Sequence, residues 1–178
     1  MYNAFNGEKR DISMQAIDVN ASSRLVQDTR SEIIQDVESM FNLKPRFNHF
    51  DDHYINEDPL VKIYGIDSVH LLHKFWISYL HTRDTSTNIY SVTHYHSSIR
   101  LVMNAIAMTR LGKIDLNATF WIELSNIGGS EKVVHFREEW NDVPLLDKDN
   151  TFFLIGWTAE MMRFIFGKIV VQISAWTC

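Results

Sequence analysis

Two histidines separated by one residue, His94 and His96, stand in a run of residues typical of a β-strand. Because alternate side chains of a strand share a face, both imidazoles could converge on one metal ion or proton path. His135 lies in another strand-like run and could supply a third ligand, with Glu139 on its face. A zinc site needs three or four converging ligands, so the alternative is an exposed or interfacial face shared with Tyr90. We predict no metal site.

A further strand-like run brings Trp121 and Glu123 to one face and Phe120 and Ile122 to the other. One of these faces lines the interior of the protein, and the sequence alone leaves open which one does so. A buried Glu123 would need a partner, because an unpaired charge in an apolar cavity costs several kcal/mol. Arg137 is the predicted partner, in a pair that could be structural only.

Two helices are expected to precede the strands that carry these side chains. Apolar residues recur at helical spacing over Arg24–Phe41 and again over Ser68–Thr82. His70 and His73 lie off the apolar stripe of the second helix, so we expect both to be solvated. Asn48–Glu57 is polar and aromatic and is assigned to neither a helix nor a strand.

The remaining half of the chain is dominated by β-branched and aromatic residues, which favour strands. A short strand is expected at 60–64, and longer ones at 88–96, 99–110, 113–124 and 132–140. Their connections are short, so neighbours are predicted to be antiparallel. Helices followed by a run of strands indicate an α+β fold, with a strongly curved, mostly antiparallel sheet wrapped around the N-terminal helices.

Composition excludes several classes of protein. The formal net charge of -5 and the lack of a dense basic stripe predict no nucleic-acid partner. Cys178 is the single cysteine, so an internal disulfide is impossible and a reducing, cytoplasmic location is expected. Residues 1–22 lack the apolar core of a signal peptide and are predicted to form a flexible tail. One domain is expected to follow, over residues 23–145.

Residues 146–178 form an apolar extension that is predicted to be helical. Glu160, Arg163 and Lys168 interrupt its apolar run near the middle, which weakens the case for a membrane-spanning helix. We expect the helix to pack across the sheet or into a partner subunit, and a homodimer is predicted. Membrane contact through residues 151–176 is the alternative.

Two stretches carry a resemblance to a known superfamily. The first runs from Glu57 through Asp58 and Pro59 to Val61, with Gly65, Ile66 and the aromatic pair Phe75–Trp76 further on. The second is Lys132–Trp140, which follows a Gly-containing turn and ends at an aromatic residue. The chain resembles the nuclear-transport-factor-2-like (NTF2-like) superfamily over about residues 23–145, and within it the ketosteroid-isomerase and SnoaL-like polyketide-cyclase branch. This resemblance implies a cone with an open mouth that holds a small apolar ligand.

The same resemblance implies a chemical role for Asp58, because ketosteroid isomerases use the Asp before this proline as a general base. A carboxylate in an apolar cone has a raised pKa, which improves it as a base near neutral pH. The alternative is that Asp58 only begins a turn, since Asp-Pro is an ordinary turn signal. The family's two oxyanion donors, a Tyr of the first helix and an Asp of the third long strand, have no counterpart in this sequence. Tyr54 or a strand histidine could substitute for them.

Two functions therefore stay open. The first is a small-molecule-binding cone that acts as an isomerase, lyase or cyclase through Asp58, without a cofactor. The second is a non-catalytic interaction module that acts through a dimer face or a membrane-associated C-terminal helix. The side chains predicted to contact a ligand are Tyr54, Trp76, His94, His96, Trp121, Glu123, His135, Arg137 and Trp140.

Overall fold

A computed structural model describes residues 24–42, 44–80, 82–141, 143, 145–146 and 153–177. The elements are α1 (Arg24–Ser39), β1 (Phe50–Glu57), β2 (Lys62–Tyr64), α2 (Ile66–Leu80), β3 (Asp84–His94), β4 (Ser98–Thr109), β5 (Gly112–Ile127), β6 (Ser130–Trp140) and α3 (Phe153–Thr177). The flexible tail predicted at residues 1–22 lies outside the described residues. The C-terminal helix predicted after the strands is present as α3.

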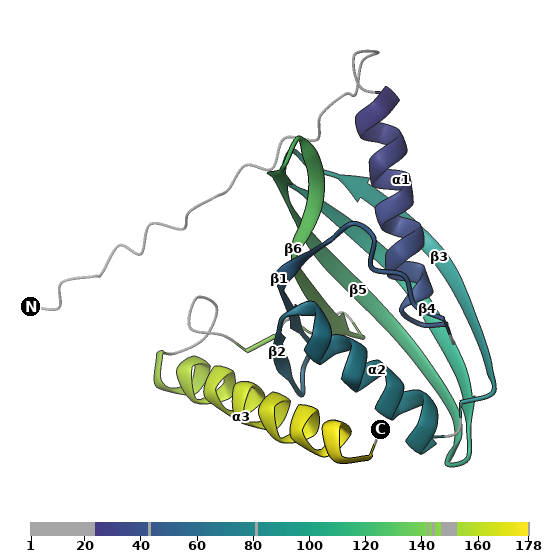
Figure 1. Ribbon diagram of the computed structural model, residues 1–178, viewed down its shortest axis with the longest axis vertical. Helices are drawn as coiled ribbons and strands as arrows, with labels where there is room; N and C mark the ends of the chain where they lie inside the picture. Colours follow the sequence, from purple (N-terminus) through teal and green to yellow (C-terminus); the bar gives the residue numbers. More distant parts are fainter. Residues whose placement is uncertain are drawn as a thin grey trace, which may run out of the picture.

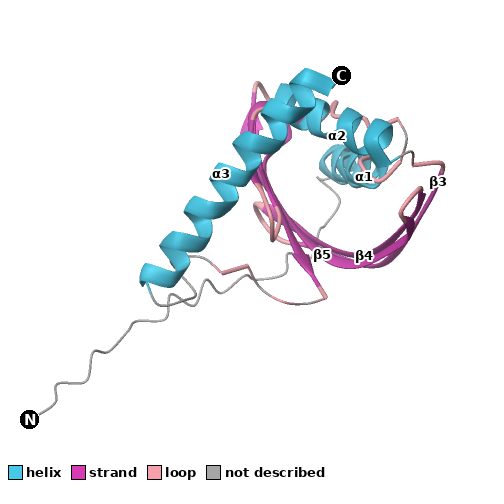
Figure 2. Ribbon diagram, turned by 90° about the horizontal axis from the view of Figure 1, so that it is seen from below, coloured by secondary structure: helices cyan, strands magenta, loops and turns pink. Residues whose placement is uncertain are grey.

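Six strands form one sheet in the order β2-β1-β6-β5-β4-β3. Every neighbouring pair is antiparallel except β1 and β6, which run parallel. The sheet bends strongly, and α1 and α2 lie within its concave side, whereas α3 lies beside α2 and β2 (Figures 1 and 2). The predicted α+β class and the curved, mostly antiparallel sheet around the N-terminal helices are confirmed.

Strand β1 was missed by the sequence prediction, which assigned Asn48–Glu57 to no element. Its buried side chains are Phe50, Tyr54, Asn56 and Glu57, and the polar residues Asp51, Asp52 and His53 occupy the positions between the first two. The polar residues hid a strand that is half-buried and pairs with β6 on one side and β2 on the other. This pairing places the segment before Asp58 against the last long strand of the sheet.

The concave face of the sheet carries the core. Inward side chains alternate along β4, β5 and β6 and pack against the apolar side of α1. The fully buried members include Ile33, Val37, Ile99, Leu101, Met103, Phe120, Ile122 and Phe136. Phe120 and Phe136 stack with ring centroids 5.3 Å apart. The interior face of β5 is therefore the one that carries Phe120 and Ile122.

Arg30 fixes α1 to the far end of the sheet. Its Nε and Nη2 atoms donate to the two carboxylate oxygens of Glu131, at 2.8 and 2.7 Å. Its remaining N–H groups donate to the carbonyls of Tyr95 and His96, at 2.7 and 2.8 Å. These hydrogen bonds tie the helix to the start of β6 and to the connection between β3 and β4.

Helix α3 lies directly on β2. A Cβ atom added to Gly167 would come within 2.3 Å of the Lys62 carbonyl oxygen, so only glycine permits this approach. None of the described helices is both long enough and apolar enough to cross a membrane.

Candidate functional site

A cavity of about 310 Å³ lies at the open end of the cone, between α2 and the inner face of the sheet. Apolar side chains of α2, β4, β5 and β6 make most of its wall, among them Val69, Leu72, Ala107, Ile114 and Phe136. Its polar lining residues are Asn42, Asn56, Asp58, His73, Thr82, Thr85, Thr109 and Glu138. A mostly apolar pocket with a few polar groups is the usual form of a small-molecule site.

Asp58 lines this cavity directly after the end of β1. Its Oδ1 atom accepts hydrogen bonds from the backbone N–H groups of Leu60 and Val61, at 2.7 and 2.8 Å. The turn role weighed from the sequence is therefore present, and it uses one carboxylate oxygen. Burial raises the pKa of Asp58, although these two N–H donors and the nearby Arg163 charge oppose the rise. One residue thus stabilises a turn and presents a carboxyl group to the cavity.

Glu138 is the second carboxyl group of the cavity, and it stands on β6 two residues after the inward Phe136. Its Oε1 atom accepts a hydrogen bond of 2.6 Å from the Trp140 indole N–H. Burial, with the nearby Asp58 charge adding to it, raises the pKa of Glu138 to about 8. Glu138 therefore carries a proton at neutral pH, whereas ordinary glutamic acid does not.

His73 reaches the cavity from α2. Its Nε2 atom lies 3.1 Å from the carbonyl oxygens of Met40 and Asn42, so Nε2 carries a hydrogen and donates. Burial lowers the pKa of His73, which keeps the ring neutral. The expectation that His73 and His70 are solvated was wrong, since both are partly buried and the His70 ring packs 4.5 Å from that of Phe47.

Solved structures share this arrangement of helices and sheet. A protein described as NTF2-like from Anabaena variabilis matches 71% of this chain and 97% of its own length, with a TM-score of 0.55 at 9% identity. A protein with a ketosteroid-isomerase-like fold from Catenulispora acidiphila, solved with trimethylamine, matches 65% of this chain and 89% of its own, with a TM-score of 0.51 at 7% identity. The chain has the NTF2-like fold.

A further similar structure is that of a proposed SnoaL-like polyketide cyclase from Jannaschia sp., which matches 65% of this chain and 86% of its own. Its TM-score is 0.52 at 8% identity. No protein-family model matches the sequence, and no curated protein matches it significantly. The relationship is therefore one of fold, and the function has to be argued from the site.

Among the side chains predicted to contact a ligand, Trp76 alone lines the cavity of the NTF2-like cone. Trp140 borders a second hollow beside α3 and supports Glu138 through its indole N–H. Tyr54 is fully buried in the core and does not belong to the cavity lining. Burial also raises the pKa of its phenol.

His94 and His96 do not converge. His94 ends β3 and faces inward, in register with the buried Ile99, whereas His96 lies in the turn after the strand and is exposed. Burial and the nearby Arg30 charge lower the pKa of His94. No group of three or more His, Cys, Asp or Glu side chains among the described residues is arranged to hold a metal ion.

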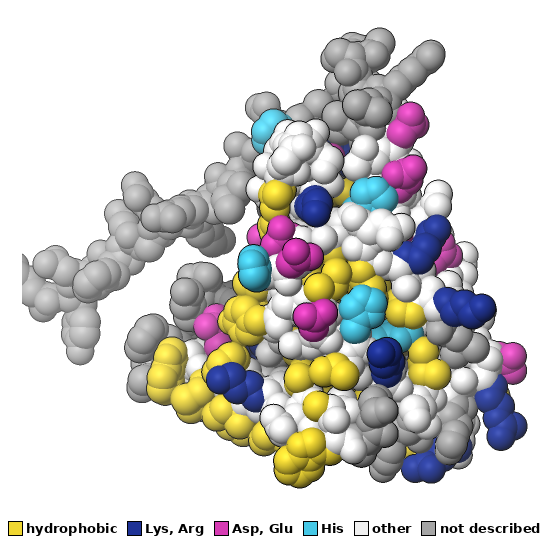
Figure 3. Space-filling model, viewed as in Figure 1, with side chains coloured by type: hydrophobic (Ala, Val, Ile, Leu, Met, Phe, Trp, Pro, Cys, Tyr) yellow, Lys and Arg dark blue, Asp and Glu magenta, His cyan; other side chains and the backbone are white. Residues whose placement is uncertain are grey.

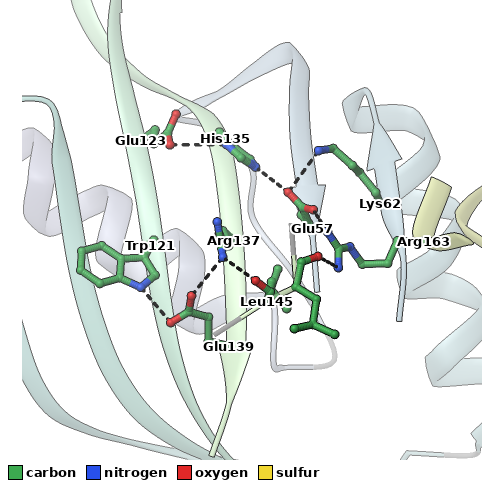
Figure 4. A network of polar contacts seen from close by, with 10 residues as sticks. Glu57, Lys62, Trp121, Glu123, His135, Arg137, Glu139, Leu145 and Arg163 are labelled. Carbon is green, nitrogen blue, oxygen red and sulfur yellow. Dashed lines mark hydrogen bonds and ion pairs between the residues drawn. The ribbon is translucent and has the colours of Figure 1, made fainter. Parts of the chain in front are cut away.

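The other predicted residues, Trp121, Glu123, His135 and Arg137, lie on the outer face of the sheet, away from the cavity (Figure 4). There the Trp121 indole donates to Glu139 at 3.1 Å, and Arg137 pairs with the same carboxylate at 3.4 Å. Their role in ligand binding stays a prediction. None of these four side chains lines the cone cavity.

His135 lies between two carboxylates of this outer face. Its Nδ1 atom lies 3.5 Å from Glu123 and its Nε2 atom lies 3.3 Å from Glu57. Hydrogen bonds to Glu123 and Glu57 raise the pKa of His135 to about 9, so the ring is protonated at neutral pH. The same hydrogen bond lowers the pKa of Glu123. Glu123 is thus paired with His135, and the nearby Arg137 charge also lowers its pKa.

Glu57 is the centre of the outer network. Arg163 of α3 donates to it at 2.9 Å, and Lys62 of β2 lies 3.3 Å away. Burial would raise the pKa of Glu57, but His135, Lys62 and Arg163 outweigh it and lower the pKa to about 2. The second N–H group of Arg163 donates to the Leu146 carbonyl at 2.8 Å. Glu57 thereby joins α3 to the strand that leads into Asp58.

Sequence reasoning missed Glu138, although the strand period could have identified it. Phe136 is the largest apolar residue in the middle of β6, so it had to face the core. Residues two positions apart share a face, and Glu138 therefore faces inward with Phe136. His135 and Arg137 have the opposite parity and must face outward.

Proposed function

We propose that the chain binds a small, neutral carbonyl compound in the cone cavity and moves a proton between two of its carbon atoms. Asp58 acts as the general base, and protonated Glu138 donates a hydrogen bond to the carbonyl oxygen. The observation that carries this proposal is the meeting of two carboxyl groups at one apolar cavity, both with raised pKa values.

The two carboxyl groups titrate as a coupled pair. The Asp58 charge contributes to the high pKa of Glu138, so the first proton leaves Asp58 and the second leaves Glu138. Backbone N–H groups support the ionised form of Asp58, whereas Glu138 receives its hydrogen bond from the Trp140 indole. When two neighbouring carboxyl groups have different pKa values, the one with the lower pKa can act as the base and the one with the higher pKa as the acid.

This protonation state supports a defined proton transfer. The free Oδ2 atom of Asp58 takes a proton from the carbon beside the carbonyl, and the C–H electron pair moves toward the carbonyl oxygen. The Glu138 O–H group stabilises the charge that develops on this oxygen. Return of the proton to another carbon completes an isomerisation, and departure of a leaving group from the same enolate completes an elimination.

The lining also favours a neutral ligand. None of the described residues around the cavity is Lys or Arg, and the lowered pKa of His73 keeps that ring uncharged. An anionic ligand would meet the Asp58 carboxylate, and no cationic side chain stands among the described lining residues to offset the repulsion. The volume of about 310 Å³ limits the ligand to a small compound.

Isomerisation of cyclohex-3-enone to its conjugated isomer tests the proposal, since ultraviolet absorbance follows the product. Proton NMR in D₂O follows exchange beside the carbonyl in the same probe and in a panel of larger cyclic ketones. We expect Asp58→Asn to lose at least about 100-fold of the rate, because the amide is not a base. Glu138→Gln keeps a neutral N–H donor and should lose only about 10-fold.

Glu139→Gln is the matched control, because Glu139 follows Glu138 on the same strand but faces outward. It should leave the rate unchanged. The proposal is wrong if the wild-type chain accelerates neither isomerisation nor exchange for any ketone of the panel. It is equally wrong if Asp58→Asn retains the wild-type rate.

A further inference from the structure

One side of α3 presents five apolar side chains to the surface, which we call the α3 stripe: Met162, Phe166, Ile169, Ile173 and Trp176. They are between 43% and 79% exposed. Their intervals along the helix are 4, 3, 4 and 3 residues. This spacing is that of the contact seam in paired helices, where apolar residues repeat every 3.5 residues on average.

A groove of about 470 Å³ continues the α3 stripe toward the start of the helix. Met162 and Phe166 form one wall of the groove, and Leu60, Trp140 and Val143 belong to its other side. Leu60 and Val143 are 58% and 63% exposed, so the groove extends the apolar surface beyond the helix. Figure 3 shows hydrophobic side chains gathered over α3 on this face of the molecule.

The combined surface is large for a chain that stays alone. With about 150–250 Å² for a large aromatic side chain, stripe and groove expose on the order of 700 Å² of apolar surface. The largest patch on a typical monomer measures about 300–600 Å². A stable pair of proteins buries about 800 Å² on each partner, which the α3 stripe and its groove nearly supply.

We propose that two copies of this chain pair through their α3 stripes, with the two helices antiparallel and crossing at Ile169. A two-fold axis at this residue brings Met162 of one copy opposite Trp176 of the other. The indole of Trp176, 79% exposed on its own chain, then enters the groove beside Met162 and Phe166. Only an antiparallel arrangement places the Met162 end of one helix beside the Trp176 end of the other. It also aligns the two helix dipoles in opposite directions, which is favourable.

Charge favours a second copy over a lipid surface as the occupant. Helices that lie on membranes carry Lys and Arg beside their apolar face, and anionic lipids attract them. In α3 the Arg163 guanidinium is buried in its pair with Glu57, and the Lys168 ammonium lies 4.3 Å from the Phe164 ring. No cluster of basic residues remains on the described part of the helix, and the chain as a whole has a net charge of -5.

The contacts of α3 with its own cone present the stripe in a fixed orientation. Arg163 and Gly167 hold the opposite side of the helix against β1 and β2. Because α3 is already held in place, little conformational entropy is lost when two α3 stripes meet, and this favours association. The pairing depends on this surface alone and not on the chemistry proposed for the cavity.

Sedimentation equilibrium of the full chain tests the pairing. We expect the mass of two chains at about 10 µM and above, as for an interface of standard size. Ile169→Glu should weaken the association by at least about 100-fold, because the two-fold axis places the new carboxylates against each other. Trp176→Ala should weaken it by about 10-fold or more, because it removes the aromatic anchor.

Trp157→Glu is the matched control. Trp157 lies on the same helix with 50% exposure, close to the 48% of Ile169, but it lies more than three turns earlier and about 120° around the helix from Ile169. It should leave the pairing within about 3-fold of wild type, since surface changes away from an interface have small effects. A melting temperature for each variant separates lost pairing from lost folding.

A disulfide trap tests the antiparallel register in a Cys178→Ser background. Met162→Cys with Trp176→Cys should link two chains on oxidation, whereas each single substitution should not. The two positions lie about 21 Å apart within one helix, too far for a bond within the chain. Linking by the single substitutions would overturn the register.

Three results would overturn the pairing itself. One is a wild-type chain that stays monomeric at about 100 µM, well above the range of a standard interface. Another is an Ile169→Glu variant that pairs like wild type. The last is a monomer that sediments with vesicles of phosphatidylcholine and phosphatidylglycerol and loses this binding in Ile169→Glu, which would assign the stripe to lipid.

Discussion

Glu57 and Asp58 are adjacent in the chain, yet one points to the outer face of the cone wall and the other to the cavity. Three cationic side chains lie around Glu57, and its pKa is lowered to about 2. Asp58 has backbone N–H groups as its direct partners, and burial raises its pKa.

The same contrast recurs one strand away, between Glu138 and Glu139. Glu138 faces the cavity and has the Trp140 indole as its hydrogen-bond donor, and burial raises its pKa to about 8. Glu139 faces outward and accepts from the Trp121 indole while pairing with Arg137. The period of a strand thus separates neighbouring carboxylates into a paired outer set and a set that lacks cationic partners inside.

This separation indicates two different tasks. The outer set holds α3 and β2 against the sheet, since each of its charges meets an opposite charge or a hydrogen-bond donor. The inner set reduces stability when it ionises, and such groups with raised pKa values are a frequent mark of functional sites. Substitutions that remove a partner from the outer set, or a charge from the inner set, test this difference.

The largest effect is expected from Arg163→Met, which removes the α3 partner of Glu57. Both side chains are 6% exposed, so the substitution leaves a buried carboxylate with Lys62 and His135 as its remaining cations. We expect the free energy of unfolding to fall by about 3–4 kcal/mol, as when one partner of a buried pair is lost. Urea denaturation at pH 7 measures it.

The companion substitution Glu57→Gln controls for lost packing. Added to Arg163→Met, it should restore part of the lost stability, because no buried carboxylate then remains without its Arg163 partner. Additive losses in the double variant would show that the pair contributes through packing alone. In that case, pairing with opposite charges would not be what distinguishes the outer carboxylates from the inner ones.

The next effect concerns the charge of Glu138 and depends on pH. Its pKa in the folded chain is about 8, above the ordinary value of 4.5. The stability that it contributes is therefore complete below about pH 4.5 and is lost as the pH rises through about 8. Glu138→Gln cannot ionise, so its advantage over wild type should grow across this window and reach about 3 kcal/mol at pH 7.

Thermal unfolding of both proteins between pH 5 and pH 9 checks this prediction. Glu139→Gln serves as the comparison, because Glu139 is held by Arg137 and Trp121 and should show no such gain at high pH. A constant difference between Glu138→Gln and wild type at all pH values would contradict a carboxyl group that is protonated at neutral pH.

The sequence predicted the long strands of the sheet and both N-terminal helices, because their apolar residues follow clear periods. It missed β1, where Asp51, Asp52 and His53 interrupt the apolar pattern of the strand. In the site, Asp58 and Trp76 were named and line the cavity. Because Phe136 faces inward, the period of the strand indicates that Glu138 also faces inward, whereas His135 and Arg137 face outward.

What the sequence could not supply is pairing across distant elements. The partner of Glu57 is Arg163, 106 residues later, on a helix whose place against β2 depends on one glycine. Glu123 and Arg137 have the right charges for each other, but their register places His135 opposite Glu123. Parity follows from local sequence, whereas register requires the paired strands.

A smaller effect is expected where α3 meets β2. Gly167→Ala places a methyl group within 2.3 Å of the Lys62 carbonyl oxygen, so the helix must shift. Alanine gains about 1 kcal/mol of helix propensity over glycine, and overpacking costs about 1–3 kcal/mol. We expect a net loss of about 1 kcal/mol and weaker coupling between Arg163 and Glu57, measured by a double-mutant cycle in the Gly167→Ala background. An increase in stability would show that α3 is free to move away from β2.

The smallest effect separates the two roles of Asp58. Asp58→Asn keeps an oxygen that accepts from the N–H groups of Leu60 and Val61, so stability at pH 7 should stay within about 0.5 kcal/mol of wild type. Asp58→Ala loses both hydrogen bonds and should cost about 1 kcal/mol. If proton transfer is lost equally in both variants while stability differs, the turn and the base are independent functions of one side chain. Equal stability of the two variants would instead show that the turn does not depend on Asp58, and the carboxylate would then stand in the cavity for its chemistry alone.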